Sequence, residues 1–112
     1  MRPDRELLKG TTETSLLAVL AVAPCHGYEL IERLRRQSQG VIAIGEGTLY
    51  PMLYKLESAG SIRGAWKIHR GRRRRVYRLT SAGHRRLDQR TEQWHELARG
   101  MKLILEGAPH VT

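Results

Sequence analysis

The chain has 112 residues, of which 40% are hydrophobic, and its formal net charge is +9. This length can bury one modest core but not two ordinary domains, so we expect a single domain with one appended element. The charge indicates a polyanionic partner, although a basic surface that serves solubility alone is the alternative. The single cysteine, Cys25, excludes an internal disulfide framework, and nothing near it has the paired spacing of a zinc site.

No stretch of the sequence approaches the roughly 18 to 20 continuous apolar residues that span a bilayer. The first residues also lack the pattern of a cleavable signal, so we expect a cytoplasmic protein without a membrane partner. The five histidines are scattered, with no helical pair at metal spacing and no isolated pair of carboxylates. We therefore expect a protein that is not an enzyme and that holds no metal or cofactor.

The first half of the chain predicts three helices. The first begins at Thr11, with Glu13 in its first turn, and ends near Pro24. The second runs from His26 to Gln37 and is amphipathic, with leucines on one face and arginines on the other. Glycine, serine and short apolar residues then interrupt the helical pattern from Ser38 to Gly45.

The third helix is predicted from about Gly47 to Ala59, and Gly60 is a natural stop. Its apolar side chains recur at i, i+3, i+4 and i+7, which is the full helical template. These residues are Leu49, Met52, Leu53 and Leu56. Because proline is tolerated only where a helix has no use for the N–H group, we expect Pro51 to lie in the first turn.

From Ser61 the pattern changes to β-branched and aromatic residues on both sides of a basic turn at Gly71. Ile62, Trp66 and Ile68 precede the turn, and Val76, Tyr77 and Leu79 follow it. Two paired strands are therefore predicted.

Thr80 is placed to cap a last helix, which Gly107 and Pro109 end. Apolar residues recur along this helix every seven residues, as in helices that associate in pairs. The expected dimerisation residues are Leu87, Trp94, Leu97, Ala98, Met101, Ile104 and Leu105. An intramolecular cover over the core is the alternative. Gly100 would permit a close approach of two helices.

Three helices, a basic hairpin and a long helix predict a mainly α winged helix-turn-helix with a two-stranded β wing and a long C-terminal dimerisation helix. We expect the DNA-binding domain at residues 1–80, the dimerisation helix at 81–107 and a tail at 108–112. In this fold the third helix enters the major groove and the wing lies along the backbone. A twofold dimer would place two such helices about 34 to 36 Å apart.

Two sets of residues are candidates for DNA contact. On the outward face of the third helix, hydroxyls, one ammonium and tyrosine rings can contact phosphates, base edges or thymine methyls. These residues are Thr48, Tyr50, Pro51, Tyr54 and Lys55. The face lacks Asn, Gln and Arg, so base discrimination could come partly from DNA shape and from the wing. The alternative is an ordinary amphipathic helix whose tyrosines cover the edge of the core.

The wing is the stronger electrostatic signal, because no acidic residue occurs from Arg63 to Arg78. Its candidate contacts are Lys67, Arg70, Arg72, Arg73, Arg74 and Arg75. If about six charges met phosphates, affinity would fall about a thousandfold between 50 and 200 mM salt. A solvated, disordered loop and a generic nucleic-acid anchor are the alternatives.

These stretches together resemble the PadR family of transcriptional regulators, in its short subgroup with one C-terminal dimerisation helix. Thr48-Leu49-Tyr50-Pro51 is the most specific match, and the similarity covers about residues 7 to 105. The other matching stretches are Lys9-Gly10-Thr11, Glu13-Thr14, His26-Gly27-Tyr28-Glu29-Leu30, Gly45-Glu46-Gly47, Leu56-Glu57, Gly60, the arginine run 73–75, Tyr77, Leu79, Thr80 and Gly83.

The resemblance implies a homodimeric regulator of duplex DNA, commonly a repressor of its own or a neighbouring operon. It implies DNA contact at Tyr28, Thr48, Tyr50, Pro51 and the wing arginines. In drug-responsive relatives an aromatic residue of the last helix lines a pore at the dimer centre, and Trp94 sits at a comparable place. Trp94 is thus either plain interface core or a flat wall for a small aromatic effector.

Two other functions remain open. A basic architectural or RNA-binding protein would read shape only, and should show little preference among duplexes. A small-molecule sensor that has lost DNA binding would instead respond through Trp94 without shifting any promoter DNA.

Overall fold

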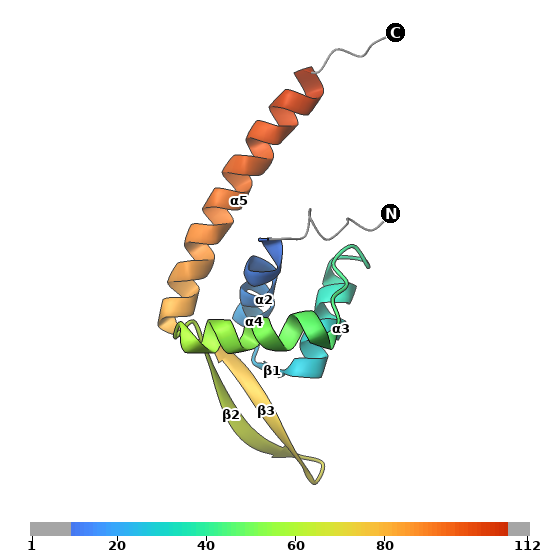
Figure 1. The fold of residues 1–112 in the computed structure, drawn as a ribbon, viewed down its shortest axis with the longest axis vertical. Coiled ribbons are helices and arrows are strands. Elements are labelled where there is room, and N and C mark those ends of the chain that lie inside the picture. The colour runs from blue at the N-terminus through green and yellow to red at the C-terminus, as the bar shows by residue number, and fades with distance from the viewer. Residues whose placement is uncertain (1–9, 108–112) are drawn as a thin grey trace.

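The computed structural model describes residues 10–107, which fold into four α-helices and three short strands (Figure 1). The elements are α2 (Thr11–Val22), β1 (Cys25–His26), α3 (Gly27–Gln37), α4 (Glu46–Ser58), β2 (Ile62–His69), β3 (Arg72–Leu79) and α5 (Ser81–Gly107). This architecture confirms the predicted mainly α winged helix-turn-helix with a long last helix. Residues 1–9 of the expected DNA-binding domain, the expected tail at 108–112 and Pro109 lie outside the described residues.

Helix α4 begins earlier than the sequence predicted, and this changes the position of its proline. The helix starts at Glu46 with Gly45 as its N-cap, so Pro51 lies in the second turn. The expectation that Pro51 occupies the first turn is therefore wrong. Because proline has no N–H group, the helix lacks the hydrogen bond that residue 51 would otherwise donate to the carbonyl of Gly47.

The wing belongs to a three-stranded antiparallel sheet in the order β1-β3-β2, so the predicted two-stranded arrangement is incomplete. The additional strand, β1, pairs Cys25 with Tyr77 and so ties the wing to the start of α3. Strands β2 and β3 pair along their full length, from Ile62 opposite Leu79 to His69 opposite Arg72. This pairing excludes the alternative that the basic segment is a disordered loop.

Only two residues connect β2 to β3. Arg70 and Gly71 both have positive φ angles, of 52° and 76°. A two-residue loop with positive φ at both positions is the type I′ turn, whose twist matches that of a hairpin. Arg70 is therefore held in a left-handed conformation that a non-glycine residue rarely adopts.

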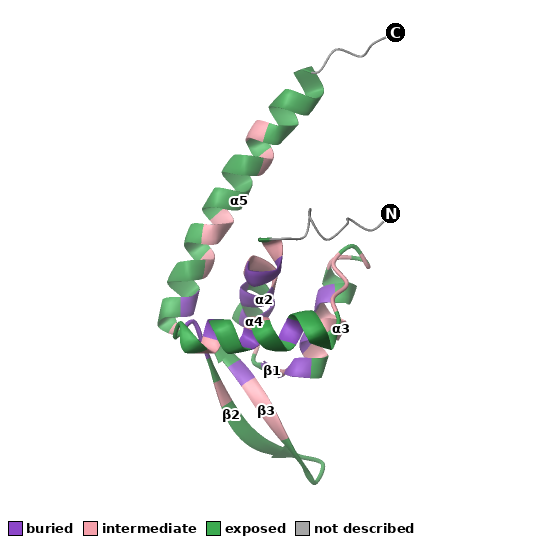
Figure 2. Ribbon diagram, in the orientation of Figure 1, coloured by how far each residue is buried: buried purple, intermediate pink, exposed green. Residues whose placement is uncertain are grey.

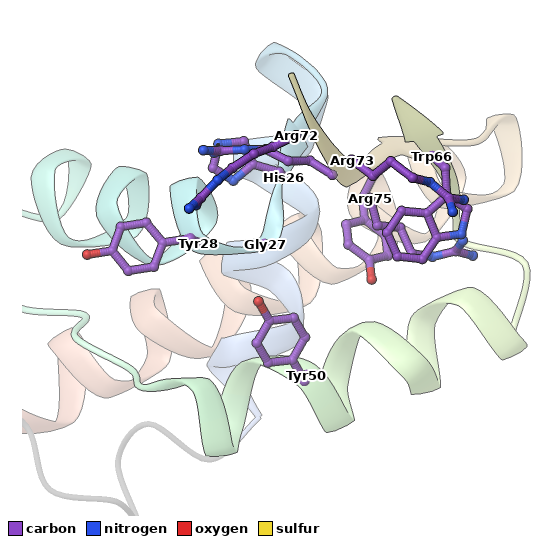
Figure 3. Close-up of a pocket in the computed structure, with 10 residues that line it drawn as sticks. His26, Gly27, Tyr28, Tyr50, Trp66, Arg72, Arg73 and Arg75 are labelled. Carbon is purple, nitrogen blue, oxygen red and sulfur yellow. Dashed lines mark hydrogen bonds between the residues drawn. The ribbon is translucent and has the colours of Figure 1, made fainter. Parts of the chain in front are cut away.

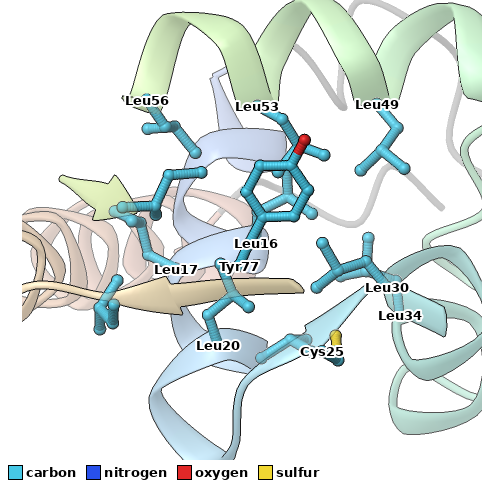
Figure 4. Close-up of a cluster of buried hydrophobic side chains, with 13 residues drawn as sticks. Leu16, Leu17, Leu20, Cys25, Leu30, Leu34, Leu49, Leu53, Leu56 and Tyr77 are labelled. Atoms are coloured by element: carbon cyan, nitrogen blue, oxygen red, sulfur yellow. The ribbon is translucent and has the colours of Figure 1, made fainter. Parts of the chain in front are cut away.

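The core lies where α2, α3 and α4 meet the base of the wing (Figure 4). It is built mainly of leucines, and seven of its side chains are less than 2% exposed. These are Leu16, Leu17, Leu30, Leu49, Leu53, Leu56 and Ile62. Met52, which the helical template placed with them, is only partly buried at the edge. The helical periodicity of the sequence thus identified the core-facing sides of α2, α3 and α4.

Thr80 fixes the start of α5, as predicted. Its Oγ1 accepts a hydrogen bond from the amide of Gly83 at 3.0 Å and donates to the carbonyl of Gly60 at 2.6 Å. Gly83 is buried, and a Cβ at this position would overlap the carbonyl oxygen of Ser61. The helix can therefore approach the β2–β3 base closely only because residue 83 has no side chain.

A second contact joins α5 to the first helix of the fold. The Glu13 side chain is 9% exposed; its carboxylate accepts a hydrogen bond from Arg86 Nε at 2.9 Å and lies 3.3 Å from Arg90 Nη2. Burial acts to raise the pKa of Glu13, but the hydrogen bond and charge of Arg86, with the charge of Arg90, bring it below its usual value. This ionic contact fixes the direction in which α5 leaves the domain.

Beyond this contact α5 extends away from the domain as a single rod, on the side opposite the wing (Figure 1). Leu87 packs against the core, whereas the later turns are largely exposed (Figure 2). None of the helices in the described part of the chain combines the length and apolar character needed to cross a bilayer.

Candidate nucleic-acid interface

The outward face of α4 presents the residues that the sequence selected. Leu49, Leu53 and Leu56 are committed to the core and Met52 packs at its edge, so the opposite face of the helix points to solvent. The five predicted residues Thr48, Tyr50, Pro51, Tyr54 and Lys55 are all exposed. Tyr54 is 76% exposed, so it does not merely cover the edge of the core. The face offers hydroxyls, an ammonium and aromatic surface to a partner.

Tyr50 of α4 and the nearby Tyr28 of α3 differ in how they are held. Tyr50 is 46% exposed, and its hydroxyl points toward the start of α3 (Figure 3). A Cβ at residue 27 would lie 2.9 Å from this hydroxyl, so Gly27 provides the room for the ring. Tyr28, in the first turn of α3, is 60% exposed and stands apart from the others. Tyr50 therefore joins α4 to α3 as well as lining the surface.

The basic residues of the wing fall into two groups. Lys67, Arg70, Arg72 and Arg73 are exposed, near the tip of the hairpin. Arg74 and Arg75 are partly buried, and each has a partner within the protein. The first group is available to phosphates without breaking any hydrogen bond or ion pair between described residues, whereas the second is not.

Arg74 reaches back to His26, the residue that caps α3. Its Nη1 lies 2.8 Å from His26 Nε2, while the Glu29 amide lies 3.4 Å from Nδ1. Burial of the ring, followed by the charge of Arg74, lowers the pKa of His26. A neutral imidazole has one acceptor nitrogen and can accept from one of these donors, whereas a doubly protonated ring can accept from neither, so the contact favours a neutral His26 at physiological pH.

Arg75 is turned toward α4. Its Nη2 donates to Glu57 Oε2 at 2.7 Å, and the two side chains are each about one-third exposed. Its guanidinium also lies 5.6 Å from the ring centre of Trp66 and 5.9 Å from that of Tyr77. Arg73 packs on the same indole at 4.8 Å. Trp66 thus serves as a platform for two neighbouring arginines of β3.

These groups surround an open groove of about 580 Å³ between the start of α3, α4 and the wing (Figure 3). Its lining combines aromatic rings with guanidinium groups: His26, Gly27, Tyr28, Tyr50, Trp66, the four arginines 72–75 and Tyr77. Such a lining suits an anionic partner with apolar or aromatic parts, which describes a nucleic-acid strand.

Several residues at this surface were not selected from the sequence as contact residues. They are His26, Gly27, Trp66 and Tyr77 of the groove lining, and Glu57, the partner of Arg75. A two-residue turn at Arg70 and Gly71 would have placed Trp66 opposite Arg75, as the observed register does. Glu57 carried no comparable signal, because its partner lies 18 positions away and on another element.

The expected dimerisation surface lies far from this groove, on α5. Past Leu87, its larger apolar side chains remain 45% to 67% exposed within one chain. On the predicted face these are Trp94, Leu97, Met101, Ile104 and Leu105, with the partly buried Ala98 among them, while Leu103 is exposed on the opposite side of the helix. Intramolecular packing accounts for Leu87 but leaves the rest of the stripe uncovered.

Comparison with known proteins gives a consistent result. The sequence matches the PadR-like family of transcriptional regulators over residues 16–89. It is 35% identical to the transcriptional regulator Rv3488 of Mycobacterium tuberculosis over 108 residues, which are 96% of this chain and 95% of that protein.

Solved structures agree with the sequence match. A PadR family regulator from Eggerthella lenta is 35% identical with a TM-score of 0.80, over 91% of this chain and 88% of its own. A PadR-like regulator from Bacillus cereus is 26% identical with the same TM-score, over 91% of this chain and 98% of its own.

Proposed function

Because the chain belongs to the PadR-like family of transcriptional regulators, we propose that it binds a specific duplex DNA site as a homodimer and represses transcription there. Membership of this family also confirms the expectation that the chain is a regulator and not an enzyme. We place its action in the cytoplasm, where the DNA lies.

The observation that carries the proposal is the exposed face of α4 beside a basic wing. Thr48, Tyr54 and Lys55 project from the helix that this fold presents to the major groove. Lys67, Arg70, Arg72 and Arg73 extend the same surface along the hairpin, where a phosphate backbone would run. With Tyr28, Tyr50 and Pro51, these residues form the proposed DNA contact. Arg74, through its contact with His26, borders it.

The proposed dimer rests on the uncovered stripe of α5. Water-exposed apolar side chains along a helix of 27 residues, about 40 Å long, are unfavourable unless another surface covers them. Pairing the stripe with its copy would cover both and relate two α4 helices by a twofold axis. Met101→Asp, within the stripe, is expected to produce monomers in analytical ultracentrifugation. The control is Leu103→Asp, because Leu103 is 62% exposed on the opposite side of the helix.

The function itself is tested by titrating the protein against duplex DNA from its own upstream region and against a scrambled duplex, each at two salt concentrations. Tighter binding to the upstream duplex that persists at the higher salt supports the proposal. Equal binding to both that salt abolishes would instead favour the alternative, a basic architectural or RNA-binding protein that reads shape only.

Two substitutions separate sequence contacts from charge contacts. Tyr54→Ala should weaken binding to the specific duplex more than to the scrambled one, because it removes a side chain of the reading face. Arg73→Gln should weaken both and reduce the steepness of the salt dependence, because it removes a phosphate contact. Equal losses on both duplexes for Tyr54→Ala would contradict the role of α4.

We also propose Trp94 as the wall of a small aromatic effector site at the dimer axis. The indole is 49% exposed and stands edge-on to His95, with ring centres 5.7 Å apart. Titration with planar aromatic compounds should quench the fluorescence of Trp94 and release bound DNA, with Trp66→Phe used to isolate the signal. Quenching of Trp94 in a protein that shifts no promoter DNA would favour a sensor that has lost DNA binding.

A further inference from the structure

Glu57 stands at a position where its charge should oppose DNA binding. It lies in the last turn of α4, the proposed recognition helix, and faces the base of the wing. A carboxylate close to phosphates repels them, so electrostatics alone favours its removal. The structure nevertheless gives it two strong hydrogen bonds: Oε2 accepts from the Gly64 amide at 3.0 Å and from Arg75 Nη2 at 2.7 Å.

Both partners of Glu57 belong to the wing. Gly64 is in β2, an edge strand of the sheet, and Arg75 is in the central strand β3. One carboxylate oxygen therefore holds both strands of the hairpin to α4. Charge-assisted hydrogen bonds of this length are the stronger kind in proteins. Removing the acceptor would leave the hairpin joined to α4 only through the backbone at 59–61 and through packing at its base.

The surroundings are shaped to hold Arg75 in this orientation. A Cβ at residue 64 would lie only 2.6 Å from Arg75 Nε, so the absence of a side chain on Gly64 lets the guanidinium cross β2 to reach Glu57. The rings of Trp66 and Tyr77 line the same path at 5.6 and 5.9 Å from the guanidinium carbon. Arg75 is thus enclosed by an acceptor, two rings and a glycine.

We propose that Glu57 and Arg75 form a strut that sets the angle of the wing to the recognition helix, so that Glu57 is a positioning residue for DNA binding. The inference rests on the proposed function. It has two consequences that charge alone would not predict. Removing the negative charge of Glu57 weakens specific binding, and Arg75 does not count among the phosphate contacts although it belongs to the arginine run.

The first test compares Glu57→Gln with Glu46→Gln in titrations against the specific and the scrambled duplex. The two variants lose the same charge from the same helix, but the exposed Glu46 makes no ion pair with any other described residue. We expect Glu57→Gln to lose about three- to tenfold in affinity for the specific duplex and nothing for the scrambled one. Glu46→Gln should bind both at least as tightly as the parent protein.

The second test is the salt dependence of Arg75→Gln and Arg73→Gln. Each phosphate contact contributes about 0.9 to the slope of log affinity against log salt. Arg73→Gln should reduce the slope by about this amount, whereas Arg75→Gln should leave it unchanged while lowering specific affinity. This comparison remains informative if Glu57→Gln proves too unstable to assay.

The hydrogen-exchange rate of the Gly64 amide measures, without DNA, whether the strut holds this amide in its hydrogen bond to Glu57. Glu57→Ala, which removes the acceptor oxygen that a glutamine would retain, should accelerate exchange there while the core amides of α2 keep their protection. Unchanged exchange, unchanged or tighter specific binding by Glu57→Gln, or a reduced salt slope for Arg75→Gln would each overturn the strut. If the parent protein fails to prefer any duplex, the proposed function fails, and the exchange result alone then decides whether the strut exists.

Discussion

Replacing Glu13 by Gln should destabilise the protein by about 2 kcal/mol. Removing one partner of a buried ion pair lowers the free energy of unfolding by about 3 to 5 kcal/mol. Here the carboxylate side chain is 9% exposed, but Arg86 is 46% and Arg90 26% exposed, so water replaces part of the lost contact. The glutamine retains one acceptor oxygen, which further reduces the cost.

The assay is urea unfolding of parent and variant at one protein concentration, because the stability of a dimer depends on concentration. Glu32→Gln is the control. Glu32 is 40% exposed and its partner Arg35 is 53% exposed, and such surface pairs contribute about 0 to 1 kcal/mol. The free energy of unfolding should fall clearly for Glu13→Gln and hardly for Glu32→Gln.

The same pair predicts a pH dependence. The pKa of Glu13 in the folded protein lies below its ordinary value of 4.5. The carboxylate therefore contributes its full stabilisation above that value and loses it as the pH falls through the lowered pKa. The stability difference between parent and Glu13→Gln should be constant near neutral pH and narrow below pH 4.5. Equal stability at neutral pH, or a difference that widens in acid, would refute the role of this ion pair.

Three further predictions concern single positions. Arg70→Asn should raise the melting temperature, because asparagine tolerates the left-handed conformation at φ 52°, and should weaken DNA binding, because a phosphate contact is lost; a lower melting temperature would contradict the turn assignment. Gly83→Ala should lower the melting temperature, because the added Cβ forces α5 away from Ser61. The control is Gly100→Ala, because a Cβ at residue 100 meets nothing within 4 Å in one chain. Measured in the Met101→Asp monomer, Gly100→Ala should not lower the melting temperature. Burial raises the pKa of the Cys25 thiol to about 11, so its alkylation in mildly alkaline buffer should be slow until urea unfolds the protein, and rapid labelling of the native protein would contradict its burial.

The helical periodicity of the sequence was sufficient to predict α2, α3, α4 and α5 and the leucines that face the core. Periodicity failed for β1, because two residues are too few to show an alternating pattern. It also misplaced Pro51, since the start of α4 at Glu46 depends on Gly45 acting as the N-cap, a position without a side-chain signature.

The candidate site was predicted in part. Exposure of Tyr54 and Lys55 follows directly from the helical pattern of α4. The division of the wing arginines does not, because it depends on partners distant in sequence: Glu57 for Arg75 and His26 for Arg74. A run of like charges in a sequence therefore indicates a basic surface without showing which of its members are available to a ligand.

The most direct test of the account is selection of binding sites from a pool of random duplexes with the unmodified protein. The account predicts enrichment of one inverted repeat, whose two halves are centred about 10 to 10.5 base pairs, or a multiple of that spacing, apart. Met101→Asp should lose the enrichment while retaining weak, salt-sensitive binding to all duplexes. Enrichment of no sequence, or of bent or A·T-rich duplexes without a repeat, would contradict the claim that two copies of α4 read a defined operator.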